Sequence, residues 1–80
     1  MPEKMPAKSR EFIEAECLKV ARREQGCSDL QRVTIGPLRP SGSGPNWEVR
    51  GFSPPLPELA FDYAMRAIDR LRQKYALKRD

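Results

Sequence analysis

Apolar side chains recur at helical spacing in two stretches of the chain. The first stretch predicts a helix that Ser9 caps and that continues to about Gln25, because a serine hydroxyl accepts a backbone N–H of the first turn. Gly26 stops this helix, since glycine adopts the left-handed conformation without a Cβ clash. The apolar face of the predicted helix consists of Ile13, Cys17, Val20 and Ala21.

The second stretch carries the stronger helical pattern. It predicts a helix from Pro57 to about Tyr75 or Leu77, and proline suits its first turn because that turn needs no backbone N–H. The three alanines of its apolar stripe leave room for a close neighbour, either a sheet or the first helix. This stripe consists of Ala60, Ala64, Ala67, Ile68, Leu71 and Tyr75.

Between the two predicted helices the apolar positions repeat every second residue. Val33 and Ile35 alternate with polar residues, and so do Trp47 and Val49. A glycine- and proline-rich segment, 39–45, lies between them and has no helix or strand signal. Two alternating strands joined by such a loop are typical of an antiparallel hairpin.

These elements predict one α+β domain of α-β-β-α order, with both helices packed on one face of an antiparallel β-hairpin. We expect residues 9–77 to form this domain, residues 1–8 to be a flexible N-terminal tail, and residues 78–80 to fray. A two-stranded hairpin leaves both strands as edges, which leads to the hypothesis of a homodimer that pairs two hairpins. The expected interaction surface consists of Arg32, Thr34, Glu48, Arg50 and Phe52.

The strand pattern also assigns the aromatic residues of the hairpin to faces. Trp47 shares the apolar face with Val49, which predicts a core residue. The alternative is that Trp47, on a strand beside Arg50, stacks on a nucleic-acid base. Phe52 falls with Glu48 and Arg50 on the other face, so we expect it to be more exposed.

Composition adds a modest positive charge. The 80 residues, enough for one domain, include 15 Lys or Arg and 11 Asp or Glu, and six basic against three acidic residues lie within 62–80. Such a patch attracts phosphates or acidic protein surfaces, although a solvated helix face has the same composition. The best candidates for contacts with nucleic acid are Arg66, Arg70 and Lys74, with Arg22 and Arg23 at the end of the first helix.

Several chemistries lack their usual residues. The chain has no histidine, and its two cysteines, Cys17 and Cys27, are too few for a zinc site. We expect both thiols to be reduced, Cys17 in the core and Cys27 in a turn. The glycines at 41–46 precede a strand, whereas a phosphate loop precedes a helix. We therefore expect no enzyme, no catalytic residue, no cofactor and no metal.

The chain has no apolar run of about 18 residues, the length that spans a membrane. We therefore expect a cytoplasmic protein with no membrane partner.

The packing motifs carry a resemblance. The pattern N-W-x-V-x-x-F at 46–52, the prolines before the last helix and A-x-x-A-I-x-x-L-x-x-x-Y at 64–75 resemble small, uncharacterised bacterial proteins of about this length. The α-β-β-α order is also similar to a double-stranded-RNA-binding domain with one strand missing. Both resemblances concern packing and topology, so they imply no activity.

Two functions remain open. The first is a non-catalytic protein–protein interaction module that self-associates through the edge of its hairpin, because the strand edges lack partners. The alternative is a nucleic-acid-binding module that uses the basic residues of the C-terminal helix. Steep weakening of binding with salt would indicate the alternative.

Overall fold

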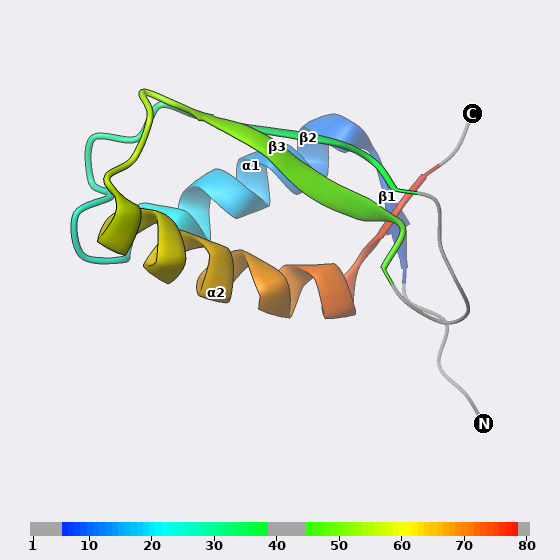
Figure 1. Ribbon diagram of the computed structural model, residues 1–80. Coiled ribbons are helices and arrows are strands. Elements are labelled where there is room, and N and C mark those ends of the chain that lie inside the picture. The colour runs from blue at the N-terminus through cyan, green and yellow to red at the C-terminus, as the bar shows by residue number, and fades with distance from the viewer. Residues whose placement is uncertain (1–5, 39–44, 79–80) are drawn as a thin grey trace.

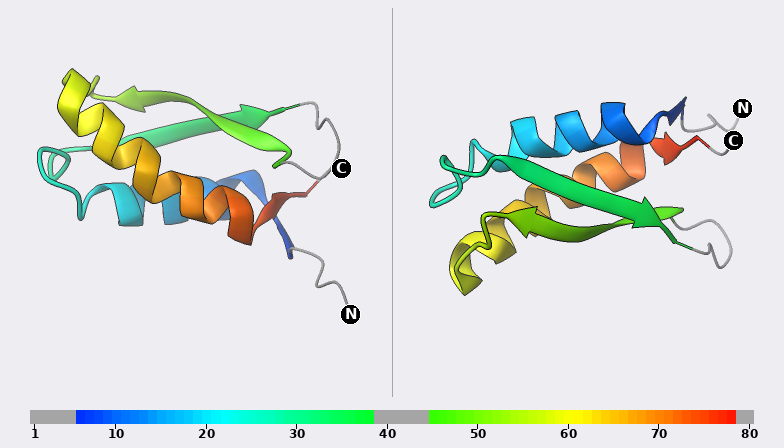
Figure 2. Two further views of the ribbon diagram at one scale, coloured as in Figure 1. Left: turned by 60° about the horizontal axis from the view of Figure 1, so that its bottom comes forward. Right: turned by 90° about the horizontal axis from the view of Figure 1, so that it is seen from above.

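The computed structural model describes residues 6–38 and 45–78, and the loop expected at 39–45 lies almost entirely outside them. Its elements are β1 (Ala7–Lys8), α1 (Arg10–Ala21), β2 (Arg32–Pro37), β3 (Trp47–Ser53), α2 (Glu58–Lys74) and β4 (Ala76–Leu77). The two helices lie on one side of the β2–β3 hairpin and form a second layer (Figures 1 and 2). Two helices and an antiparallel hairpin agree with the α+β class.

The first helix begins where the sequence predicts and ends one turn early. Ser9 Oγ accepts the backbone N–H of Phe12 at 3.1 Å, which satisfies one of the free donors of the first turn. The helix ends at Ala21, not at about Gln25, because the next N–H groups bond to carbonyls three residues earlier and tighten the chain into turns. Gly26 has a φ of 85°, the left-handed conformation expected of it.

A register shift divides the hairpin into two parts. Ile35 lies opposite Val49, but Thr34 lies opposite Gly51, so Arg50 is an additional residue in β3. One additional residue in one strand of an antiparallel pair is a β-bulge. A bulge reverses the alternation of faces along the strand that carries it.

The bulge overturns the predicted position of Phe52. Beyond the bulge Phe52 lies opposite Val33, and directly opposed residues point to the same face of a sheet. Val33 is buried, so Phe52 also faces the helices and packs edge-on against Phe61 of α2, with 5.4 Å between ring centroids. Strict alternation puts Phe52 on the outer face with Glu48 and Arg50. That prediction is wrong because the bulge shifts the pattern by one residue.

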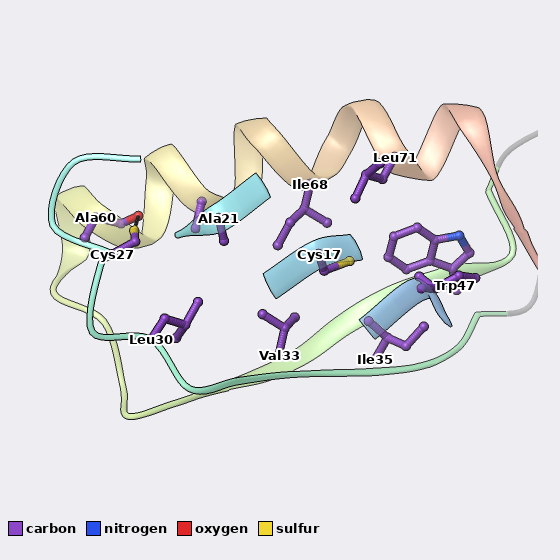
Figure 3. Close-up of a cluster of buried hydrophobic side chains, with 12 residues drawn as sticks. Cys17, Ala21, Cys27, Leu30, Val33, Ile35, Trp47, Ala60, Ile68 and Leu71 are labelled. Atoms are coloured by element: carbon purple, nitrogen blue, oxygen red, sulfur yellow. Dashed lines mark hydrogen bonds between the residues drawn. The ribbon is translucent and has the colours of Figure 1, made fainter. Parts of the chain in front are cut away.

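Trp47 lies in the core, as the apolar face of its strand predicts. It is fully buried, and its Nε1 donates to the carbonyl oxygen of Tyr75 at 3.0 Å, so its one polar atom is satisfied. Figure 3 shows Trp47 near Leu71 at one end of the core and Cys27 beside Ala60 at the other. The buried hydrophobic residues of the core are Ile13, Cys17, Ala21, Cys27, Leu30, Val33, Ile35, Trp47, Ala60, Ala64, Ile68 and Leu71.

The two ends of the described chain meet in a short parallel pair that the sequence did not predict. β1 pairs with β4, and the Lys78 N–H donates to the Lys8 carbonyl oxygen at 2.8 Å. Asn46 supports this pair, because its side-chain amide exchanges two hydrogen bonds with the backbone of Leu77, at 2.8 and 3.0 Å. The predicted tail 1–8 and frayed end 78–80 therefore each include residues that belong to the fold.

Candidate functional site

A groove runs between the end of α1 and one side of α2. Its larger part has a volume of about 320 Å³ and adjoins a second hollow of about 220 Å³, with which it shares Glu24, Ala67 and Arg70. We call the two together the basic groove. It is lined by Val20, Arg23, Glu24, Tyr63, Arg66, Ala67, Arg70, Leu71 and Lys74.

The helical repeat of α2 builds one wall of the basic groove. Tyr63, Ala67, Arg70 and Lys74 are spaced i, i+4, i+7 and i+11, which places them on one side of the helix. Ala67 keeps the groove open because its methyl group is too short to fill it. Arg72 lies on the other side of α2 and contacts β3 instead.

The structure brings together four of the five basic residues that the sequence offers as nucleic-acid contacts. Arg23, Arg70 and Lys74 line the larger part of the basic groove, and Arg66 lines the adjoining hollow. Arg22 lines neither part. It is the C-cap of α1, where its backbone N–H bonds to a carbonyl of the last turn, and its side chain is exposed.

The basic groove has an excess of positive charge. Among residues 6–38 and 45–78, no carboxylate lies within 4 Å of its arginines or its lysine. Asp69, which precedes Arg70 in the chain, lies 3.7 Å from Arg72 instead. Glu24 is the carboxylate that lines the groove, against four basic side chains. An anion would therefore find unpaired cationic groups on both walls.

The outer face of the hairpin carries four of the five residues of the predicted interaction surface. The Arg50 guanidinium lies over Gly36, donates to the Pro37 carbonyl oxygen at 2.8 Å and pairs with Glu48 at 3.2 Å. A Cβ atom at Gly36 would approach Arg50 Nε to 2.6 Å, so the Arg50 side chain can lie here only because residue 36 is a glycine. The remaining two residues are an exposed Arg32 and a half-buried Thr34.

Side chains from the helices cover part of each strand edge. On β2, the Ile35 N–H donates to Glu14 Oε2 at 2.9 Å, and on β3 the Trp47 carbonyl oxygen accepts from Arg72 Nε at 3.0 Å. Both backbone groups point away from the partner strand, where an added strand would bond. Sequence reasoning missed these contacts, because Glu14 and Arg72 are read from the chain as ordinary charges on helix surfaces.

Neither cysteine is placed for nucleophilic chemistry. Both are buried free thiols, and Cys27 Sγ donates to the Ala60 carbonyl oxygen at 3.4 Å. Burial, with help from the Glu14 and Glu16 carboxylates, raises the pKa of Cys17 to about 12, and burial also raises the pKa of Cys27. A thiol with a raised pKa is protonated at neutral pH and reacts poorly.

Comparison with known proteins gave no match. No family model, no curated protein and no solved structure matches this chain. The resemblances drawn from the sequence therefore stay predictions, and function has to be inferred from the residues of the site. In the described part of the chain, neither helix has the length and apolar character that crossing a bilayer requires.

Proposed function

We propose that this protein is a non-catalytic nucleic-acid-binding module whose basic groove contacts the phosphate backbone. One observation carries this proposal. Arg23, in the turn after α1, converges with Arg70 and Lys74 of α2 on a single groove, and none of the three forms an ion pair within the described residues. Phosphates would supply the missing negative charge.

The arrangement of the cations suits a chain of phosphates better than a single anion. Arg66, Arg70 and Lys74 follow each other every four residues, which spaces them about 6 Å apart along the helix axis. A guanidinium can hold a phosphate through two parallel N–H donors, so arginine is well suited to such contacts. Arg23 adds a fourth cation from the opposite wall.

Salt dependence tests this proposal. We expect a fluorescently labelled 20-nucleotide DNA or RNA to bind in anisotropy titrations, with an affinity that falls as salt rises from 20 to 200 mM. For a single strand on three or four cations, the slope of log K against log salt is expected to be about −2 to −3. Arg70→Ala should lower the magnitude of this slope by about 0.7.

Arg32→Ala is the matched control. It removes the same charge from the outer face of the hairpin, on the layer opposite the helices, and we expect the slope to stay unchanged. Absence of any binding at 20 mM salt would reject the proposed function. Equal effects of the two substitutions would reject the basic groove as the site.

Self-association through the hairpin is the second candidate function. No described element covers the outer face of the hairpin, since both helices lie on the other side (Figure 2). That face carries both signs of charge, on Arg32, Glu48 and Arg50, so it can complement a second copy across a twofold axis. Pairing with an added strand would break the bonds that Glu14 and Arg72 make to the backbone of β2 and β3. Contact through the outer faces of two hairpins leaves these bonds intact.

Sedimentation at 10 and 200 µM tests this candidate. We expect a dimer at the higher concentration, weakened by Glu48→Lys if the outer face is the interface. If the β3 edge is the interface, Arg72→Ala should instead strengthen the dimer, because it frees the Trp47 carbonyl oxygen. A 9.2 kDa species at both concentrations would reject self-association.

A further inference from the structure

We infer that the nucleic acid is single-stranded and that one of its bases stacks on Tyr63, at the end of the basic groove. This inference rests on the proposed function and names the form of its ligand. It also accounts for an apolar hollow beside the basic groove, for which phosphate binding alone has no use.

The apolar hollow lies between the turn after α1 and the first turns of α2. It has a volume of about 240 Å³ and is lined by Gln25, Gly26, Pro57, Leu59, Ala60 and Tyr63. Leu59 is 65% exposed although it is a large apolar residue. Gly26 contributes no side chain, and a Cβ atom there would approach the Ala60 Cβ to 3.1 Å, so the turn passes close to α2 at this point.

Tyr63 connects the apolar hollow with the basic groove. Its half-buried side chain lines the hollow on one side and the adjoining part of the basic groove on the other. Arg66 and Arg70 follow it by three and seven residues, about 4.5 and 10.5 Å along the helix axis. An aromatic ring and two cations therefore lie within the span of neighbouring nucleotides.

This combination favours a single strand over a duplex. In a duplex the bases stay stacked inside the helix, so only phosphates and groove edges reach a protein surface. A single strand can turn one base out to stack on an aromatic side chain while its phosphates follow the cations, and such stacking accepts any base. An acidic protein segment would match the charge but would not require the aromatic ring.

An abasic strand, which has phosphates but no bases, distinguishes binding that needs a stacked base from binding that needs only negative charge. Three 20-nucleotide probes are titrated in anisotropy at 50 mM salt: an oligothymidylate, an abasic strand of equal length and charge, and a duplex. We expect the oligothymidylate to bind at least about fivefold more tightly than the abasic strand, since one stacked base supplies that much. Tyr63→Leu should remove this preference, and Tyr63→Phe, which keeps the ring, should retain it.

Each outcome decides the inference. Equal binding of the oligothymidylate and the abasic strand overturns it while leaving the proposed function intact, as does tighter binding of the duplex. Tighter binding of a poly-glutamate peptide of equal charge would overturn both the inference and the proposed function. If no probe binds even at 20 mM salt, the proposed function itself fails. The three probes are compared on the unmodified protein, so this test does not depend on the folding of Tyr63→Leu. Circular dichroism shows whether that variant folds.

Discussion

Replacing Trp47 by alanine is expected to leave about half or more of the molecules unfolded at 25 °C. Trp47 is fully buried, and truncation of a buried tryptophan to alanine costs about 3–5 kcal/mol of unfolding free energy. The core of a chain of this length supplies a net stability of only about 3–5 kcal/mol. The loss therefore equals the whole stability of the fold.

The contacts of Trp47 add to this loss. Its indole donates to the Tyr75 carbonyl oxygen, and its own carbonyl oxygen accepts from Arg72, so Trp47 joins β3 to the end of α2. The alanine variant keeps the backbone contact but loses the indole bond. Without that bond, β4 also loses part of the support for its pairing with β1.

Urea titration followed by circular dichroism measures the effect. Trp47→Phe is the control, because it keeps an aromatic ring but lacks the N–H donor, and we expect it to cost only about 1–2 kcal/mol. A Trp47→Ala protein with the urea midpoint of the unmodified chain would show that the tryptophan does not hold the two layers together.

Reversing two charges of the basic groove is expected to abolish nucleic-acid binding. The double substitution Arg70→Glu and Lys74→Glu removes two cations from the groove and places two carboxylates beside Glu24. Each lost phosphate contact weakens binding, and the new carboxylates repel the backbone. We expect the affinity at 50 mM salt to fall on the order of 100-fold or more.

A second double substitution controls for net charge. Arg32→Glu with Lys78→Glu also lowers the formal charge from +4 to 0, because each reversal changes it by two, but both residues are exposed and lie outside the basic groove. We expect this variant to keep most of its affinity. Equal losses in the two variants would mean that net charge, not the groove, attracts nucleic acid.

The sequence predicts one wall of the basic groove but not the position of Arg23 opposite Arg70. The line of Arg66, Arg70 and Lys74 on one side of α2 follows from the helical repeat alone. Whether Arg22 or Arg23 joins them depends on the path of the chain after α1, which tightens into turns at Ala21. The apolar hollow beside Tyr63 likewise exists only because that turn packs against α2.

The sequence by itself determined those features that depend on neighbours close along the chain. Periodicity is a local property, so the two helices, their apolar faces, the Ser9 cap and the burial of Trp47 could be predicted. The tertiary structure alone decided the features that join distant segments. The bulge at Arg50 turns Phe52 inward, Glu14 and Arg72 cap the strand edges, and β1 pairs with β4 across almost the whole chain. Each of these depends on contacts whose partners no local pattern specifies.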